Sequence, residues 1–309
     1  MSKVKLISTP LHDGNSTRGV GEYTRRLMSM IQYQDKDFDI VHYPFFDLFK
    51  HTLPIFKKSK TVVTIHDVIP LEYPEIYKPG IKGRLNLFLQ GLALQNVDAV
   101  ITDSHASINA IHKHLGVPHE KLKLVYLAAG KEFVKRKISK KYDLPKQFVL
   151  YIGDVNWNKN ISGLIEACKK INLPLVIIGR QAKEIENMDL NHPELSHLKS
   201  LDLDYLSDEE KIDILNLASV YCQPSFAEGF GIPVLEAMAC GTQVAVSNTH
   251  SLPEIAGEAA EYFDPHDTSQ MAEAIKKSLV NKFDVITQSK KFTWEKTALE
   301  TIKVYESIS

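Results

Sequence analysis

Short apolar runs alternate with longer amphipathic stretches along the whole chain, and this alternation limits most strongly what the chain can fold into. The β-branched and apolar runs predict strands, and the stretches between them, such as 23–32 and 85–95, predict helices. Strands that alternate with helices form parallel, doubly wound sheets. In the first half the predicted strands are 4–8, 39–43, 61–65, 99–102 and 122–127.

The second half repeats this plan. Its predicted strands are 148–152, 175–178, 220–223, 243–247 and 262–263, and its predicted helices include 161–170, 208–216, 233–239 and 271–279. A chain of 309 residues with 44% hydrophobic content is long enough for two domains. The polar, lysine-rich stretch 135–146 is the expected boundary. We therefore predict an α/β protein with domains 1–145 and 146–292.

The two halves carry opposite net charge. Residues 1–150 hold 23 lysines and arginines against 14 carboxylates, and residues 151–309 hold 14 against 24. A basic half attracts an anionic partner, such as a phospholipid surface or a phosphate-bearing substrate, although uneven charge without any partner explains the division equally well. The basic, partly apolar stretches 50–60 and 131–137 are candidates for membrane contact, with a solvated loop as the alternative.

Composition argues against a membrane-spanning or secreted protein. No apolar run approaches the roughly 20 residues that span a bilayer, and the first residues lack the long apolar segment of a signal peptide. We therefore expect a cytoplasmic protein, peripheral at most to the inner face of the membrane. The three cysteines lack the spacing of metal ligands, so we expect reduced thiols and no structural metal.

The stretch 226–241, FAEGFGIPVLEAMACG, places two glutamates around a glycine-rich turn. Glu228 directly precedes the turn, and Glu236 stands on an otherwise apolar helix. Glycines let the backbone approach a ligand, a helix amino end attracts phosphate, and a carboxylate accepts hydrogen bonds from neighbouring hydroxyls. Ligands of open α/β sheets bind outside the carboxyl ends of the strands, so we expect the turn on one wall of an interdomain cleft. The alternative is a capping helix whose dipole Glu236 matches.

The longer stretch EGFGIPVLEAMACGTQVAVSN resembles the paired-glutamate motif of glycosyltransferase family 4, a family of retaining GT-B enzymes. The stretches 18–27, 64–70, 151–160, 205–215, 251–267 and 292–308 are similar to that family's motifs in the same order, in particular to its bacterial mannosyltransferase-like members. The resemblance covers nearly the whole chain. It implies the GT-B fold, in which two Rossmann-like doubly wound domains face each other across a cleft.

The resemblance implies roles for the residues of the second domain. Glu236 would bind the ribose hydroxyls of the donor nucleotide, and Glu228 would hold the donor sugar. Lys159, which follows the strand-end residue Gly153, would neutralise the diphosphate as negative charge grows on the leaving group, although a solvated loop lysine is the alternative. The backbone N–H groups that would contact the sugar and phosphates belong to Gly229, Phe230, Gly231 and Ile232.

In the first domain, Gly19 and Gly21 resemble the family's glycine loop, and we expect them to form a turn before a helix that begins near Glu22. His66 follows a predicted strand, and the resemblance implies that it lies near the transferred sugar and stabilises the developing oxocarbenium ion. A lone histidine at a strand end is otherwise more often structural. Asp67 fits the cap of a turn, and Ser104 fits a helix cap as well as an acceptor contact.

The implied reaction transfers a hexose, mannose or glucose, from a nucleotide diphosphate sugar to a glycan, lipid-linked or small-molecule hydroxyl with retention of configuration. Retaining glycosidases use a carboxylate nucleophile, which this family does not offer at a comparable place. We therefore expect a same-face displacement without a cofactor or bound metal, with His66, Lys159 and Glu228 as the catalytic residues. No nucleic-acid partner is expected, and uracil, guanine and adenine donors stay open.

Two positions depart from the family pattern. Asp154 and Asn158 stand where many members carry an arginine, which makes the phosphate site less basic unless Arg18 or Arg180 compensates. One alternative is therefore a weakly active or inactive nucleotide-sugar-binding subunit. Another is a different GT-B reaction such as nucleotide-sugar epimerisation, which needs acid and base residues that the motifs do not supply.

The last predicted helix, 294–307, has an apolar stripe. In the GT-B resemblance this segment, about 293–309, crosses back onto the first domain. We expect the same path here.

Overall fold

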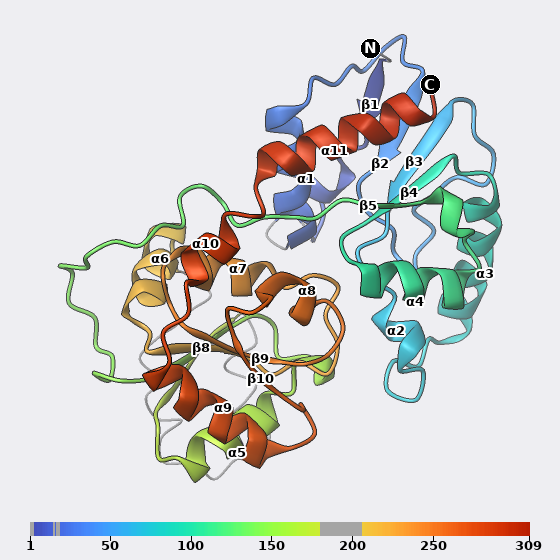
Figure 1. Cartoon of the computed structure of the whole chain (residues 1–309). Coiled ribbons are helices and arrows are strands. Elements are labelled where there is room, and N and C mark those ends of the chain that lie inside the picture. The colour runs from blue at the N-terminus through green and yellow to red at the C-terminus, as the bar shows by residue number, and fades with distance from the viewer. Residues whose placement is uncertain (1–2, 15, 17–18, 180–205) are drawn as a thin grey trace. The chain divides into compact units, whose positions relative to one another are not determined.

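The computed structural model describes residues 3–14, 16, 19–179 and 206–309, and it divides the chain into two compact units. Unit 1 comprises Met1–Ala128 and Phe292–Ser309, and unit 2 comprises Ala129–Lys291 (Figure 1). The stretch 135–146, in which we expected the boundary, lies in unit 2. Its Arg136 N–H donates to Asn216 Oδ1 (2.7 Å), and its Tyr142 hydroxyl donates to Asp213 Oδ2 (2.7 Å). These bonds tie the stretch to helix α6 (Asp208–Leu217).

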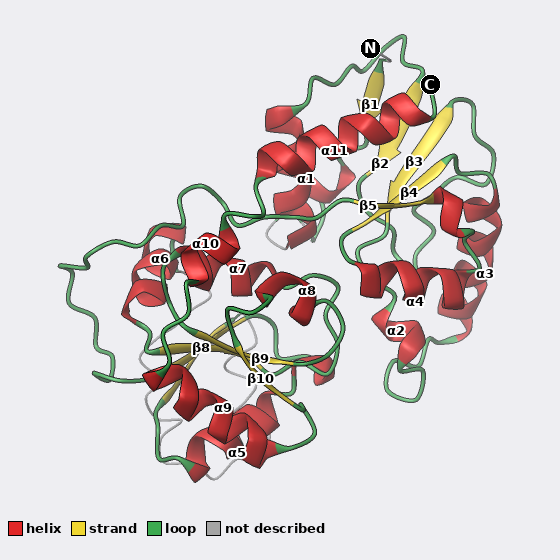
Figure 2. Cartoon of the chain, viewed as in Figure 1, coloured by secondary structure: helices red, strands yellow, loops and turns green. Residues whose placement is uncertain are grey.

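Unit 1 is built on a five-stranded parallel sheet in the order β1-β2-β3-β4-β5. Nearly every residue of β3 and β4 is buried, as expected for a parallel sheet with both faces covered (Figure 2). The strands are β1 (Val4–Leu6), β2 (Ile40–Tyr43), β3 (Lys60–Thr64), β4 (Ala99–Thr102) and β5 (Leu122–Leu124). The helices are α1 (Gly19–Met30), α2 (Ile69–Glu72), α3 (Ile81–Gln95), α4 (His105–Leu115) and α11 (Trp294–Ser307), with short 3-10 helices at Thr9–Leu11 and His119–Lys121.

The glycine pair near the amino terminus does not form the turn that we expected before a helix at Glu22. Helix α1 begins at Gly19, so Gly19 and Gly21 both lie in its first turn, and Gly21 is buried. Local bonds favour this early start, because Thr24 Oγ1 donates to the Val20 carbonyl (2.8 Å) and Glu22 pairs with Arg26 one turn later (2.6 Å). The expected turn is therefore wrong for these two glycines.

Helix α11 packs in unit 1, against β2 and β3, through a buried chain of polar groups. The Tyr305 hydroxyl lies 2.7 Å from His42 Nδ1, and His42 Nε2 lies 2.8 Å from Thr64 Oγ1. Thr297 Oγ1 adds a bond to the Tyr126 carbonyl (2.7 Å). The carboxyl-terminal segment thus supplies a partner to a histidine that is completely buried in the sheet.

Unit 2 holds a second five-stranded parallel sheet in the order β10-β9-β8-β6-β7. The chain passes from β6 to β7 on one side and then returns to β8 on the other side of β6, so a topological switch point lies between β6 and β8. The strands are β6 (Val149–Ile152), β7 (Leu175–Ile178), β8 (Val220–Gln223), β9 (Val244–Ser247) and β10 (Glu261–Phe263). The helices are α5 (Ile161–Lys170), α6, α7 (Ile232–Ala239), α8 (Leu252–Ala256), α9 (Thr268–Val280) and α10 (Val285–Ser289), with a 3-10 helix at Trp157–Lys159.

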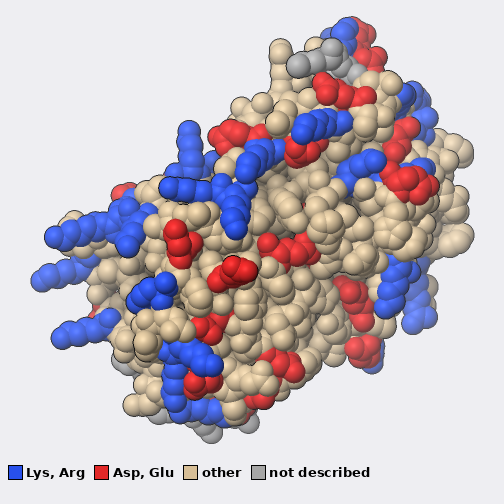
Figure 3. All heavy atoms as spheres, viewed as in Figure 1, with Lys and Arg blue, Asp and Glu red and all other residues tan. Residues whose placement is uncertain are grey.

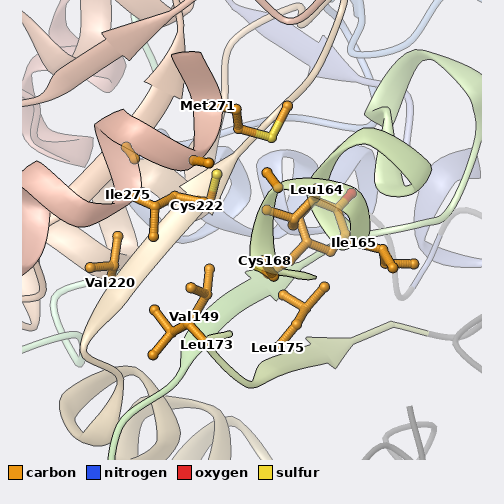
Figure 4. Packing of buried hydrophobic residues seen from close by; sticks show 14 of the residues in the cluster. Val149, Leu164, Ile165, Cys168, Leu173, Leu175, Val220, Cys222, Met271 and Ile275 are labelled. Atoms are coloured by element: carbon orange, nitrogen blue, oxygen red, sulfur yellow. The ribbon is translucent and has the colours of Figure 1, made fainter. Parts of the chain in front are cut away.

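The core of unit 2 lies where α5 and α9 cover strands β6, β7 and β8 (Figure 4). Leu164 and Cys168 of α5 and Met271 and Ile275 of α9 meet the β-branched side chains of the strands, and all are buried. This packing holds the strands in place. The loops that follow β6 and β8 therefore begin at a rigid edge of the sheet. In the described part of the chain, no helix is both long and apolar enough to cross a membrane.

The buried His42 predicts a pH dependence of stability. Burial lowers the pKa of His42 to about 3, from an ordinary value of 6.5. Below pH 6.5 the unfolded chain therefore takes up a proton that the folded chain refuses, so the free energy of unfolding falls as pH falls toward 3. We expect His42 alone to lower the free energy of unfolding by about 2 kcal/mol between pH 7 and pH 5. Denaturant unfolding at both pH values measures it. In His42→Asn the free energy of unfolding should fall by about 2 kcal/mol less between these pH values than in the wild type. The same pH dependence in variant and wild type would contradict the assignment to His42.

Candidate functional site

The centre of the candidate site in unit 2 is an ion pair between Lys159 and Glu228. Lys159 ends the 3-10 helix after β6, and Glu228 lies on the loop after β8, so the pair stands at the switch point. The ammonium of Lys159 lies 2.7 Å from one carboxylate oxygen of Glu228 and 2.8 Å from the other. The Lys159 side chain is 21% exposed and that of Glu228 only 8%. A ligand at this edge therefore meets a lysine whose position the protein has already set.

Glu228 is fixed by further hydrogen bonds. Its Oε1 accepts from Gln223 Nε2 (2.7 Å) and from Ser225 Oγ (2.6 Å). The backbone around it is fixed as well, because Ser251 Oγ donates to the carbonyls of Glu228 (3.1 Å) and Phe230 (2.7 Å). A carboxylate held by several donors keeps one rotamer, which is what a site for sugar hydroxyls requires.

Two glycines adopt backbone conformations that other residues avoid. Gly231 precedes α7 with φ of 109°, and a Cβ there would meet Leu252 Cδ2 at 3.0 Å. Gly153 directly follows β6 with φ of 153°, and a Cβ there would lie 2.7 Å from the Tyr151 hydroxyl. Burial, helped by Glu228, raises the pKa of Tyr151, so its neutral hydroxyl donates to the Asp154 carbonyl (2.8 Å). Both glycines thus let the loops of the site turn at the strand edge.

Asn158, which stands where the family resemblance suggested an arginine, has a structural task. Its Nδ2 donates to the Ala227 carbonyl (3.1 Å), and its own carbonyl accepts from Phe226 N–H (2.8 Å). These bonds join the loop of Lys159 to the loop of Glu228, so Asn158 aligns the two catalytic candidates without adding charge. Arg18 and Arg180, which we considered as compensating cations, lie outside the described residues.

Glu236 has a cation partner of its own. It lies one turn inside α7, is 6% exposed, and its Oε2 is 2.6 Å from Lys211 Nζ of α6. The same ammonium lies 5.0 Å from the centre of the Phe133 ring, in a cation–π arrangement. Within the described part of the chain Lys211 is the one partner of this carboxylate. The two glutamates of the motif therefore form separate sites with different cations.

In unit 1, the candidate residue His66 lies between Asp103 and Tyr23. His66 follows β3, and its Nδ1 lies 2.5 Å from Oδ2 of Asp103, which follows the neighbouring strand β4. Tyr23 of α1 contacts the His66 ring edge-on, with centroids 5.0 Å apart, so helix α1 packs beside the histidine. Burial alone would lower the pKa of His66, but Asp103 outweighs it and raises the pKa above its ordinary value. His66 therefore carries positive charge more readily than a solvated histidine does.

Sequence reasoning missed Lys211 and Asp103. The signal for Asp103 was available, because a carboxylate directly after β4 lies at the same sheet edge as His66 after β3. No spacing rule links Lys211 to Glu236, since their contact depends on how α6 packs beside α7. Asp67 and Ser104 act as caps, as one of our alternatives had it: Asp67 Oδ1 accepts from Ile69 N–H (3.1 Å), and Ser104 Oγ accepts from Ser107 N–H (3.0 Å).

No group of three or more histidine, cysteine, aspartate or glutamate side chains is arranged to hold a metal ion in the described part of the chain. The cations at the site are lysines, which are able to pair with phosphate directly.

Two family models cover most of the chain. Residues 134–296 match the model described as glycosyl transferases group 1, and residues 3–128 match the model described as glycosyltransferase family 4. Each match falls mainly within one unit of the structure.

Curated relatives include two bacterial mannosyltransferases. The chain is 31% identical over 271 residues to O-antigen chain mannosyltransferase B of Escherichia coli, which covers 80% of this chain and 70% of the relative. It is 30% identical over 265 residues to the serotype-specific mannosyltransferase WbdA of Escherichia coli, covering 77% of this chain and 32% of that protein. The chain thus spans about a third of the length of WbdA.

Solved structures share the fold. The sucrose-phosphate synthase of Thermosynechococcus elongatus aligns with 97% of this chain and 82% of its own at a TM-score of 0.70 and 19% identity. Anabaena Alr3699/HepE, solved in complex with UDP and glucose, aligns with 87% of this chain and 78% of its own at 0.66 and 17% identity. These likenesses show a GT-B fold.

The Lys211–Glu236 pair predicts a stability effect. Lys211→Met leaves the buried carboxylate without its cation, so we expect the free energy of unfolding to fall by about 1–3 kcal/mol. Adding Glu236→Gln should recover part of the loss, because the amide carries no charge. Lys170→Met removes exposed contacts with Glu166, Thr268 and Ser269 and serves as the control, with a smaller change of about 1 kcal/mol or less. Denaturant unfolding measures all three, and equal losses in Lys211→Met and the control would contradict the coupling.

Proposed function

Because the chain belongs to the group 1 and family 4 glycosyltransferases, we propose that it transfers a hexose, most readily mannose, from a nucleotide diphosphate sugar to a hydroxyl of a glycan or lipid-linked acceptor with retention of configuration. The observation that carries the proposal is the fixed Lys159–Glu228 pair at the switch point of unit 2. The named activity of the mannosyltransferase relatives supports the choice of sugar.

Each element of the unit 2 site has a part in holding the donor. Lys159 neutralises the diphosphate, and Glu228 accepts a hydrogen bond from a sugar hydroxyl. Glu236 accepts from the ribose hydroxyls. The turn from Gly229 to Ile232 brings its backbone close to the sugar and phosphates, a proposal supported by the positive φ of Gly231 at the start of α7. Gly153 lets the loop of Lys159 leave the strand at the same edge.

The proposed chemistry is a displacement on one face of the sugar. The bond between the anomeric carbon and the phosphate oxygen breaks, and a bond to the acceptor oxygen forms on the same face. The leaving phosphate oxygen takes the proton of the acceptor hydroxyl, so no separate base is required. Lys159 stabilises the charge that develops on the diphosphate, and the fixed geometry of the site lowers the cost of reaching that state. We propose that this needs no metal ion.

His66 is the proposed contribution of unit 1. Asp103 fixes the orientation of its ring and favours its charged form. A positively charged imidazole near the donor would complement the phosphates. Because that charge would repel an oxocarbenium ion, we propose that the backbone of His66, and not its ring, stabilises the developing ion. We propose that Gly19 and Gly21, at the start of the helix that carries Tyr23, approach the donor phosphate from unit 1.

A second candidate is a nucleotide-sugar-binding subunit with little turnover. It is favoured by Asn158, whose side chain joins two loops of the site and adds no charge to the phosphate region. This candidate predicts donor binding without slow hydrolysis of the donor in the absence of acceptor. Such hydrolysis, detected as released nucleotide diphosphate, favours the transferase.

We also propose that the protein works in the cytoplasm in peripheral contact with an anionic membrane surface, where a lipid-linked acceptor is found. The excess of cations in residues 1–150 supports this contact.

Calorimetry without added metal tests the donor site. We expect one of the GDP-, UDP- and ADP-hexoses to bind the wild type, and Lys159→Ala to weaken that binding about 10- to 100-fold because a charge-assisted contact to phosphate is lost.

Lys170→Ala, an exposed lysine at the end of the next helix, is the matched control and should leave the affinity unchanged. Absence of binding by all three nucleotide sugars, with chelator or with magnesium, would overturn the proposed function. Equal affinity of the wild type and Lys159→Ala would remove Lys159 from the diphosphate site.

The ribose role of Glu236 gives a second test. Glu236→Gln should bind the preferred nucleotide about 10-fold more weakly, and it should discriminate less between that nucleotide and its 2′-deoxy and 3′-deoxy analogues, since the lost acceptor served those hydroxyls. Unchanged discrimination by the variant would contradict the role.

A further inference from the structure

Helix α3 of unit 1 has two opposite apolar faces. Gln90, Ala93 and Leu94 are buried and face the core. On the other side, Ile81, Leu85 and Phe88 follow the spacing of one helical stripe and are 91%, 57% and 63% exposed. A helix that only covers a sheet needs one apolar face. The second, exposed stripe therefore indicates a binding partner.

The exposed stripe continues into a groove. Phe88 and Leu92 of α3 border a cavity of about 590 Å³ whose other wall includes Leu115, Val117 and Pro118, at the end of α4 and just beyond it. The apolar area therefore extends beyond α3 to the end of α4.

Two basic side chains lie next to this apolar area. Helix α3 carries Lys82 and Arg84, both exposed, and no carboxylate from residue 81 to 95.

The segment before the helix packs on the other side of α3, next to its buried face. Leu53 N–H donates to Gln90 Oε1 (3.1 Å), and Lys57 Nζ donates to the Ala93 carbonyl. In Figure 3 the edge where Figure 1 draws α3 is mostly uncharged, and both basic and acidic groups lie next to it.

We infer that this α3 surface, formed by Ile81, Lys82, Arg84, Leu85 and Phe88, docks the protein on an anionic lipid bilayer. The apolar side chains enter the boundary of the acyl chains, and the cations meet the headgroups, as in other interfacial helices. Charge favours this occupant over a second copy of the chain. The α3 surface carries two exposed cations and no carboxylate, so two such surfaces would repel each other.

The inference deepens the proposed membrane contact by naming its surface, and its test requires neither donor nor acceptor. The full chain is floated with vesicles of phosphatidylcholine alone or of about three parts phosphatidylcholine to one part phosphatidylglycerol. We expect the wild type to float with the anionic vesicles, and less so at high salt.

Two double variants separate the apolar and the charged contributions. Leu85→Gln with Phe88→Gln should lose about tenfold or more of the binding, since two large apolar side chains no longer enter the bilayer. Lys82→Gln with Arg84→Gln should lose about tenfold on anionic vesicles. The matched control, Val280→Gln with Leu299→Gln, alters side chains that are 78% and 53% exposed elsewhere and should float like the wild type.

Three results would overturn the inference: a wild type that does not float, α3 variants that float like the control, or equal binding to neutral and anionic vesicles. Sedimentation without vesicles adds a further outcome. A wild-type dimer that the Leu85 and Phe88 substitutions turn into a monomer, with vesicle binding unchanged, would assign the surface to a second copy. Nucleotide-sugar calorimetry on the same variants should be unchanged, so a failure here and a failure of the proposed function are told apart.

Discussion

The ion pair between Lys159 and Glu228 holds together the candidate site of unit 2. It joins the loop after β6 to the loop after β8, the two neighbouring strands between which the sheet of unit 2 reverses its direction of growth. Taking a lysine and a glutamate partly out of water costs energy unless both are well paired, and here Gln223 and Ser225 complete the set of donors around the carboxylate. The result is a cation in a set position beside a helix amino end, which is a suitable arrangement for a diphosphate.

The remaining features of unit 2 support that pair. The core between α5, α9 and the strands fixes where β6 and β8 end, and Asn158 fixes the distance between their loops. Gly153 and Gly231 provide the backbone freedom that close packing of the loops demands. Glu236 is kept apart from Glu228 by its own partner, Lys211, so each carboxylate can serve a different hydroxyl of a donor. The same principle recurs in unit 1, where Asp103 holds His66 at the end of two adjacent parallel strands.

The sequence predicted those parts of the molecule whose signal is local. Apolar runs located every strand of both sheets, and the glycine turn with Glu228 and Glu236 located the loop and helix of the site. Contacts between distant segments were not predictable in this way. Lys211 contacts Glu236 only because α6 packs beside α7. The stretch 135–146 belongs to unit 2 because it bonds to α6, and its polar composition does not predict these bonds. The start of α1 was placed too late because glycines usually weaken helices, whereas the side-chain bonds of Thr24 and Glu22 stabilise the first turn here.

The most direct test of the account follows the donor sugar itself during turnover. Proton NMR of the preferred nucleotide hexose, with enzyme and chelator but without acceptor, would show the anomeric configuration of the first hexose released, before it equilibrates in water. We expect slow release of the same anomer as in the donor, without metal, and far slower release by Lys159→Ala. Release of the opposite anomer would contradict the same-face displacement, and no release in the presence of tight donor binding would contradict the assignment as a transferase.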